Sequence, residues 1–156
     1  MSLKGDRNYN DNVDISFFKS DGVDTRGLIQ IHDTTASGSG AAMDDANQLV
    51  MTPTGVISGT YPAGMLLNDV VSYDLTRQHL NQHKDETQLG GKVTLLRRGT
   101  VVTNNIEAST APGPGNPAYV NTTGDLTPTS GTNYIKAGTF LSKLDADGYA
   151  KVEINI

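Results

Sequence analysis

The sequence predicts a small all-β domain, and three observations support that fold class. The 17 Gly and 6 Pro residues are spread along the chain, which suits many short strands joined by tight turns. Of the 17 acidic residues, 14 are Asp, which favours turns, and only three are Glu, which favours helix interiors. The C-terminal stretch Tyr134–Ile156 has the alternating pattern of a β-hairpin. At 156 residues the chain is long enough to bury one core.

Residues 1–26 are expected to form an N-terminal arm. The segment is rich in Asp and Asn and has too few apolar residues to fold alone. Its apolar residues include Val13, Ile15, Phe17 and Phe18. We expect Ile15, Phe17 and Phe18 to dock on a neighbouring subunit as partner contacts, because large apolar side chains act as anchors. A frayed terminus is the alternative interpretation.

Residues 27–156 are expected to form a β-rich body. Its strands are predicted at Gly27–Asp33, Ala46–Thr54, Gly55–Tyr61, Met65–Asp74, Ala118–Val120 and Asp125–Thr127, and Lys92–Val102 is predicted as a pair of strands bent at Gly99. Pro62-Ala63-Gly64 is predicted as a turn, and Thr34–Gly40 and Asn104–Asn116 as loops. Asp74–Leu89 has two possible structures, a helix or an extended chain. The helix is considered because Leu75, His79, Leu80 and His83 fall near helical spacing.

The closing hairpin turns at Asp145–Gly148. Its second strand alternates between apolar and polar residues, with Ala150, Val152, Ile154 and Ile156 on one face and Tyr149, Lys151, Glu153 and Asn155 on the other. A period of two residues predicts one buried and one solvent-facing side.

Charge and composition narrow the class of function. The net charge of −5 and the pI of about 5.0 argue against nucleic-acid binding through a broad basic surface. The chain has no Cys and no apolar run of membrane-helix length, and its N-terminus lacks a signal-peptide core. The hydrophobic content of 36% and aromatic content of 6% are low, which indicates that partner subunits supply part of the stability.

The sequence carries no catalytic signature, and we expect no cofactor and no metal. There is no nucleophile elbow, phosphate loop or dinucleotide fingerprint. His79 and His83 have a metal-like spacing, and His32, Asp85 or Glu86 could add a ligand, but a solvated histidine pair is the more ordinary reading.

Several runs resemble structural proteins from the heads of tailed bacteriophages. They are Leu66–Val71, Asp74–His79, His83–Glu86, Gly90–Leu96, Ala137–Leu141 and Asp147–Val152. The last two resemble the closing hairpin of the small capsid decoration, or cement, proteins, and the similarity covers roughly residues 27–156.

This resemblance implies a small β-barrel or β-tulip-like domain that forms homotrimers and binds the major capsid protein on the outside of the virion. It implies no enzymatic activity and no cofactor. Such a protein would be made in the host cytoplasm and would clamp neighbouring capsid subunits. Two alternatives from other classes are a head-fibre module that binds host glycans through Tyr61, Tyr119 or Tyr134, and a metal enzyme built on His79 and His83.

Overall fold

A computed structural model describes residues 3–4, 12–22, 24–34, 48–55, 59–69, 86–87 and 91–156. All regular structure in these residues is β, which confirms the predicted all-β class. Thirteen strands lie in the described segments: β1 (Leu3–Lys4), β2 (Asn12–Asp14), β3 (Phe18–Lys19), β4 (Asp24–Thr25), β5 (Ile29–His32), β6 (Leu49–Met51), β7 (Pro62–Asp69), β8 (Glu86–Thr87), β9 (Val93–Thr103), β10 (Pro117–Val120), β11 (Leu126–Thr127), β12 (Ile135–Phe140) and β13 (Ala150–Asn155).

One large sheet contains eleven of these strands in the order β11-β10-β12-β13-β9-β7-β5-β6-β3, with β1 and β2 also paired to β9. A separate pair is made by β4 and β8. Among the described strands the path runs open from β11 to β3, so the barrel or tulip detail of the prediction is not confirmed. A bridge between Phe18 and Lys92 nevertheless brings β3 back beside the start of β9.

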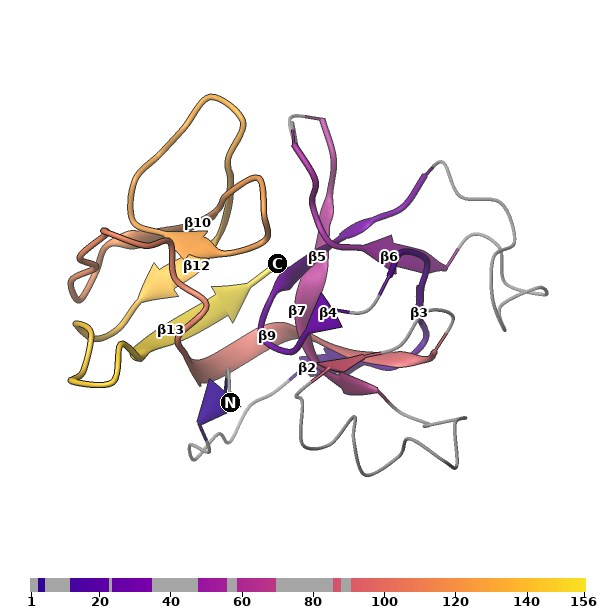
Figure 1. Cartoon of the computed structure of the whole chain (residues 1–156), viewed down its shortest axis with the longest axis horizontal. Coiled ribbons are helices and arrows are strands. Elements are labelled where there is room, and N and C mark those ends of the chain that lie inside the picture. The colour runs from indigo at the N-terminus through magenta and orange to yellow at the C-terminus, as the bar shows by residue number, and fades with distance from the viewer. Residues whose placement is uncertain are drawn as a thin grey trace.

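Strand β9 joins two regions of the molecule (Figure 1). Its first part pairs with β7, with Leu96 opposite Met65. Its second part pairs with β13, with Gly99 opposite Ile154. The prediction of two strands bent at Gly99 is wrong, because Gly99 lies inside this single strand and the pairing with β13 continues through it without a register shift. Strands β10 to β13 therefore lie on one side of the molecule and β3, β5 and β6 on the other.

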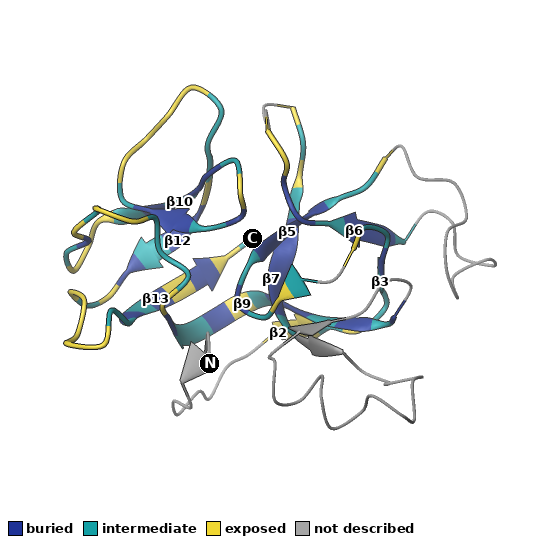
Figure 2. Cartoon of the chain, in the orientation of Figure 1, coloured by how far each residue is buried: buried dark blue, intermediate teal, exposed yellow. Residues whose placement is uncertain are grey.

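Buried apolar side chains form two clusters (Figure 2). The larger one lies mainly under the C-terminal strands and consists of Ile29, Met65, Leu96, Ala118, Val120, Leu126, Ala137, Phe140, Ala150, Val152 and Ile154. The smaller one lies under the N-terminal strands and consists of Val50, Ala63, Leu66, Val93 and Leu95, with Phe17 packed against it. Ile29 on β5 and Met65 on β7 belong to the larger cluster, which therefore continues from the C-terminal strands into the N-terminal region.

The closing hairpin has the predicted register. Ala150, Val152 and Ile154 are at most 1% exposed, whereas Glu153 on the other face is exposed. The turn predicted at Pro62-Ala63-Gly64 is wrong, because these residues begin β7 and pair with β5. Gly64 has a φ of 154° at a register shift, so the same glycine that suggested a turn accommodates an irregular strand.

One sequence prediction concerns residues that the structure mostly does not describe. The helix alternative over Asp74–Leu89 lies mostly outside the described residues, although Glu86–Thr87 within it form β8. None of the described residues form a helix of the length and apolarity needed to cross a bilayer.

Candidate partner-binding surface

Strand β2 and the residue that follows it present two apolar side chains at the surface. Val13 is 46% exposed and Ile15 is 51% exposed. The strand pairs with β9 and ends where the side chain of Asp14 accepts hydrogen bonds from the Ser16 amide and hydroxyl, at 2.8 and 2.5 Å. This local turn holds Ile15 between two fixed segments. The exposed pair therefore stands on ordered backbone.

The two phenylalanines beside this pair are half-buried. The Phe17 ring packs against the smaller core cluster and meets the His32 ring edge-on, with centroids 5.2 Å apart. The Phe18 ring lies 5.5 Å from the Lys92 ammonium, in a cation–π arrangement. Of the three predicted contact residues, Ile15 is thus the most available to a partner, and both phenylalanines also pack within the fold.

The backbone of this segment is tied to the body on two sides. The Phe18 amide donates to the Gln48 carbonyl at 2.9 Å, and the Val93 amide donates to the Phe17 carbonyl at 3.0 Å. The structure therefore places this part of residues 1–26 between β6 and the start of β9.

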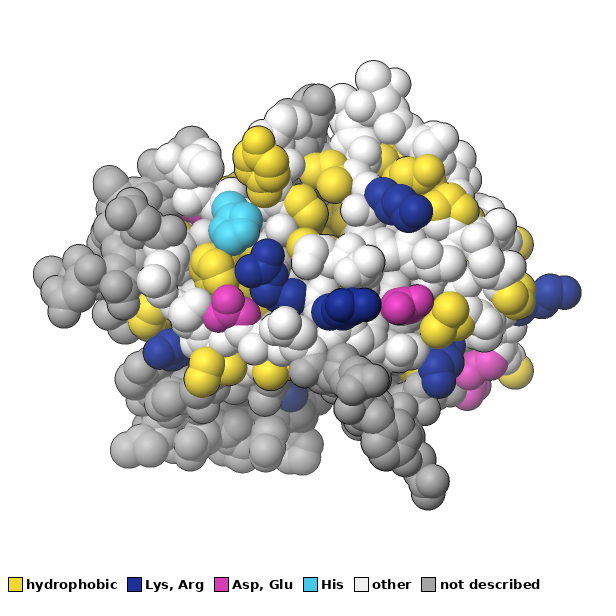
Figure 3. Space-filling view, turned by 180° about the vertical axis from the view of Figure 1, so that it is seen from behind, with side chains coloured by type: hydrophobic (Ala, Val, Ile, Leu, Met, Phe, Trp, Pro, Cys, Tyr) yellow, Lys and Arg dark blue, Asp and Glu magenta, His cyan; other side chains and the backbone are white. Residues whose placement is uncertain are grey.

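Charged groups surround the exposed pair. The hydroxyl of Ser16 holds the pKa of Asp14 below its usual value, and the nearby Arg97 charge acts in the same direction. Partial burial lowers the pKa of His32, the Arg97 charge adds to this effect, and Asp14 opposes it. On the face seen in Figure 3, hydrophobic side chains lie next to a histidine and several Lys, Arg and acidic side chains. We name Val13, Ile15, Asp14, His32 and Arg97 the β2 surface.

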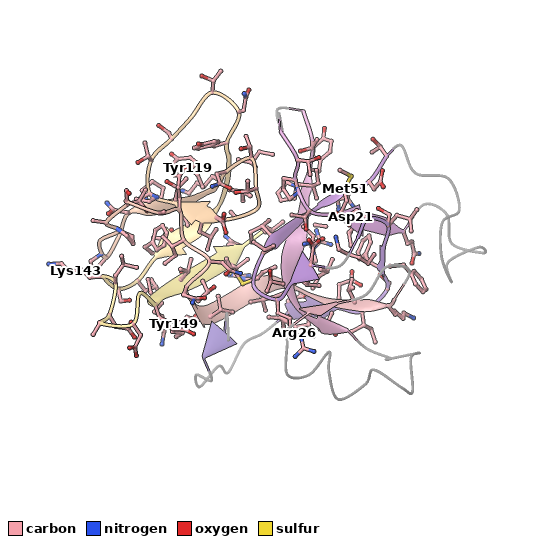
Figure 4. All side chains as sticks on the ribbon, viewed as in Figure 1. Asp21, Arg26, Met51, Tyr119, Lys143 and Tyr149 are labelled. Carbon is pink, nitrogen blue, oxygen red and sulfur yellow. The ribbon has the colours of Figure 1, made fainter. Side chains whose placement is uncertain are left out.

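A buried ion cluster lies in the N-terminal region, and the sequence carries no signal that predicts it. Lys19 is fully buried, and its ammonium contacts the carboxylates of Asp21 and Asp24. It also donates a hydrogen bond to Gln30 Oε1 at 3.0 Å, and Gln30 Nε2 donates to Thr52 Oγ1 at 2.9 Å. We name these five residues the Lys19 cluster; Asp21 is labelled in Figure 4.

The Lys19 cluster joins three segments of the fold. Lys19 is on β3, Gln30 is on β5 and Thr52 follows β6. The Thr52 amide donates to Asp21 Oδ2 at 3.0 Å, so the acidic turn is also fixed to β6. A buried ammonium with carboxylate and amide acceptors is satisfied, so this arrangement is a structural contact with no free reactive group.

No arrangement for catalysis is found in the described residues. No three His, Cys, Asp or Glu side chains among them gather closely enough to hold a metal ion. An open polar depression of about 270 Å³ is lined by Lys136, Gly138, Thr139, Glu153 and Asn155, without a nucleophile next to a base. His79, His83 and Asp85 lie outside the described residues.

Comparisons with known proteins agree with a structural role. The model of a family described as "Structural cement protein (E217 gp24/Pam3 gp6)" matches residues 14–155. No curated protein sequence matches the chain. A solved structure titled "The capsid of Myoviridae Phage XM1" has a similar fold, with a TM-score of 0.61 at 13% identity over 94% of this chain and 84% of that one.

Proposed function

Because the chain belongs to the structural cement protein family, a family of structural proteins and not of enzymes, we propose that it binds the outer surface of a phage capsid and clamps neighbouring major capsid subunits together. The observation that carries this proposal is the family match over nearly the whole chain. The similarity in fold to a capsid structure supports it.

The β2 surface is the contact that we assign to the capsid. Ile15 is its most exposed apolar residue, with Phe17 and Phe18 set beside it. Burying the exposed half of an isoleucine contributes only about 1 kcal/mol. A cement protein repeats such a contact over many equivalent positions of a shell, and this repetition turns a modest interaction into a large stabilisation of the whole.

Homotrimer formation belongs to the same proposal. The low aromatic content of 6% and the small N-terminal core favour stabilisation by partner copies. In this arrangement the exposed side chains of Val13 and Ile15 face the shell. Synthesis takes place in the host cytoplasm, and the protein then adds to the capsid exterior.

Co-sedimentation with capsids that lack the protein tests this function. We expect the unaltered chain to saturate such capsids, and Ile15→Asp to bind at least about tenfold more weakly, because a carboxylate would be desolvated at the contact. Ile15 is half-exposed and belongs to neither core cluster, so the melting temperature of the variant should stay close to that of the parent.

Ser130→Asp is the matched control, because it adds the same carboxylate at an exposed residue between β11 and β12, in the C-terminal region. We expect it to bind capsids like the parent. If Ile15→Asp also binds like the parent, the β2 surface is not the contact. If the unaltered chain does not bind capsids at all, the cement function itself is wrong.

The exposed ring of Tyr61 also favours the second candidate, a head-fibre module that binds host glycans. An exposed aromatic ring can stack on a sugar, whereas Tyr119 and Tyr134 are half-buried. Glycan-array binding that is lost in Tyr61→Ser would support this candidate.

A further inference from the structure

The polar depression of about 270 Å³ lies on the outward face of β12 and β13, which run side by side (Figure 1). Thr139 on β12 lies directly opposite Glu153 on β13, so their side chains share this face. The next pair along the strands, Phe140 and Val152, belongs to the core on the other face. The register of the two strands therefore brings the polar side chains together. The lining residues are Lys136, Gly138, Thr139, Glu153 and Asn155.

The polar side chains around the depression are available to a ligand. Within the described residues, no hydrogen bond or ion pair engages the side chains of Lys136, Thr139, Glu153 or Asn155. The turn between the same two strands is different, because Asp145 Oδ1 accepts hydrogen bonds from two backbone amides. The fold thus uses the polar side chain of Asp145 and leaves those of the depression unused.

These side chains supply both hydrogen-bond donors and acceptors. The Lys136 ammonium donates and the Glu153 carboxylate accepts. The Asn155 amide and the Thr139 hydroxyl do both. One positive and one negative charge line the depression, so a charged ligand would be attracted by one and repelled by the other. A neutral ligand with several hydroxyl groups matches the donors and acceptors without such repulsion.

The chemistry of the depression favours a sugar over a protein partner. Water fills an open polar depression in solution, and a ligand must reproduce the hydrogen bonds of the water that it displaces. A sugar hydroxyl donates and accepts as water does. The centre of a protein–protein contact is apolar instead, and none of the lining residues has an apolar side chain.

The size of the depression suits a single sugar ring. Its volume lies just below the lower bound of about 300 Å³ for small-molecule sites. Tyr119 on β10 lies opposite Lys136 in the β10–β12 pair, so its half-buried ring is on the same face, beside the depression. An aromatic ring in this place offers an apolar surface on which the next ring of an oligosaccharide can stack.

We propose that the polar depression is a carbohydrate-binding site, which takes one neutral hexose ring of an oligosaccharide. The side chains of Lys136, Glu153 and Asn155 bind its hydroxyl groups. This inference goes beyond the proposed cement function and does not involve the β2 surface. It also differs from the glycan candidate built on Tyr61, which lies just before β7 in the N-terminal region.

NMR titrations of the whole chain test the site. The probes are methyl glucoside, methyl galactoside and methyl mannoside. Glycerol and sodium acetate are controls for hydroxyl groups without a sugar ring and for an anion. The test variants are Lys136→Ala and Glu153→Ala. The matched control is Lys143→Ala, which removes the same ammonium from an exposed residue between β12 and β13. Melting temperatures check that each variant folds.

We expect at least one glycoside to shift the backbone amides of Lys136–Thr139 and Glu153–Asn155 in a saturable way, with half-saturation at about 1 mM. Each test variant should raise this concentration at least about tenfold, because a hydrogen bond to a charged group is lost. Lys143→Ala should keep the value of the parent, and both test variants should bind capsids like the parent.

Four results would overturn the sugar site. The first is that no glycoside gives saturable shifts at these amides, and the second is that acetate gives the same shifts as the glycosides. The third is that both test variants bind the glycoside like the parent. The fourth is loss of capsid binding in both test variants, which would make the depression a contact with the capsid. None of the first three results affects the cement function, which is tested by capsid binding of the parent.

Discussion

The two regions joined by β9 are stabilised in different ways. The C-terminal region, β10 to β13 with the second half of β9, encloses mainly apolar side chains, among them Phe140, Val152 and Ile154. The N-terminal region, β3 to β7 with the first half of β9, has the smaller apolar cluster and encloses the fully buried Lys19 and Gln30. The stability of the C-terminal region therefore depends on apolar packing, and that of the N-terminal region depends partly on the Lys19 cluster.

The strand pairings of the two regions also differ. In the C-terminal region every pairing between named strands is antiparallel. In the N-terminal region β3 pairs with β6 in parallel, and the two are far apart in sequence. Local antiparallel pairs are fixed by their own turns, whereas a distant parallel pair needs a tertiary contact to hold it. The Lys19 cluster supplies such a contact, because it joins β3 to the chain after β6.

The largest loss of stability is expected when a charge is placed in the core of the C-terminal region. Val152 is fully buried and lies opposite Val101, so Val152→Asp buries a carboxylate without a partner. We expect a loss of about 4 kcal/mol in the free energy of unfolding, measured by urea titration. Lys151→Asp, on the outward face next to it, should cost less than about 1 kcal/mol. Equal losses would mean that the strand register is wrong.

The contrast between the regions also explains how far the sequence could predict the fold. In the closing hairpin, apolar and polar residues alternate strictly, so Ala150, Val152 and Ile154 were assigned correctly to the core face. The β10–β11 turn, which contains Gly124 at a φ of 88°, is likewise predicted correctly from a local glycine signal. Each of these features is encoded within a few neighbouring residues.

The structure of the N-terminal region is harder to predict from the sequence, because the residues that determine it are distant from one another along the chain. A lysine in an Asp-rich segment ordinarily lies in solvent, and only the acceptors on Asp21, Asp24, Gln30 and Thr52 allow Lys19 to be buried. Ile15 is predicted as a contact from its apolar character alone, and this stays a prediction. The arrangement of Asp14 with His32 and Arg97 depends on strand pairing, which the sequence does not show.

The second-largest loss of stability is expected when the cation of the Lys19 cluster is removed. Lys19→Met leaves the carboxylates of Asp21 and Asp24 close together without their cation. We expect a loss of about 3 kcal/mol in the free energy of unfolding, because removing the cation leaves two partly buried carboxylates uncompensated.

The matched variant combines Lys19→Met with Asp21→Asn and Asp24→Asn. It removes the charges together and keeps acceptor oxygens for Thr52, so more than half of the lost stability should return. If the triple variant is no more stable than Lys19→Met, the charges are not the reason for the loss, and the two regions differ less than the structure indicates.

A smaller effect is expected where two strands of the C-terminal region approach each other closely. At Gly138 on β12, an added Cβ would lie 1.9 Å from the Glu153 carbonyl oxygen on β13. Gly138→Ala must therefore push the two backbones apart, and we expect a loss of about 2 kcal/mol. Gly22, in the N-terminal region, has nothing within 4 Å of an added Cβ, so Gly22→Ala should change stability by less than about 0.5 kcal/mol. The strand pair cannot relax by a side-chain rotation, because the atom in the way belongs to the backbone. Thermal melts of both variants compare the regions directly: an equally mild result for Gly138→Ala would mean that the closing hairpin is loosely packed, and that its stability does not depend on the close contact between β12 and β13.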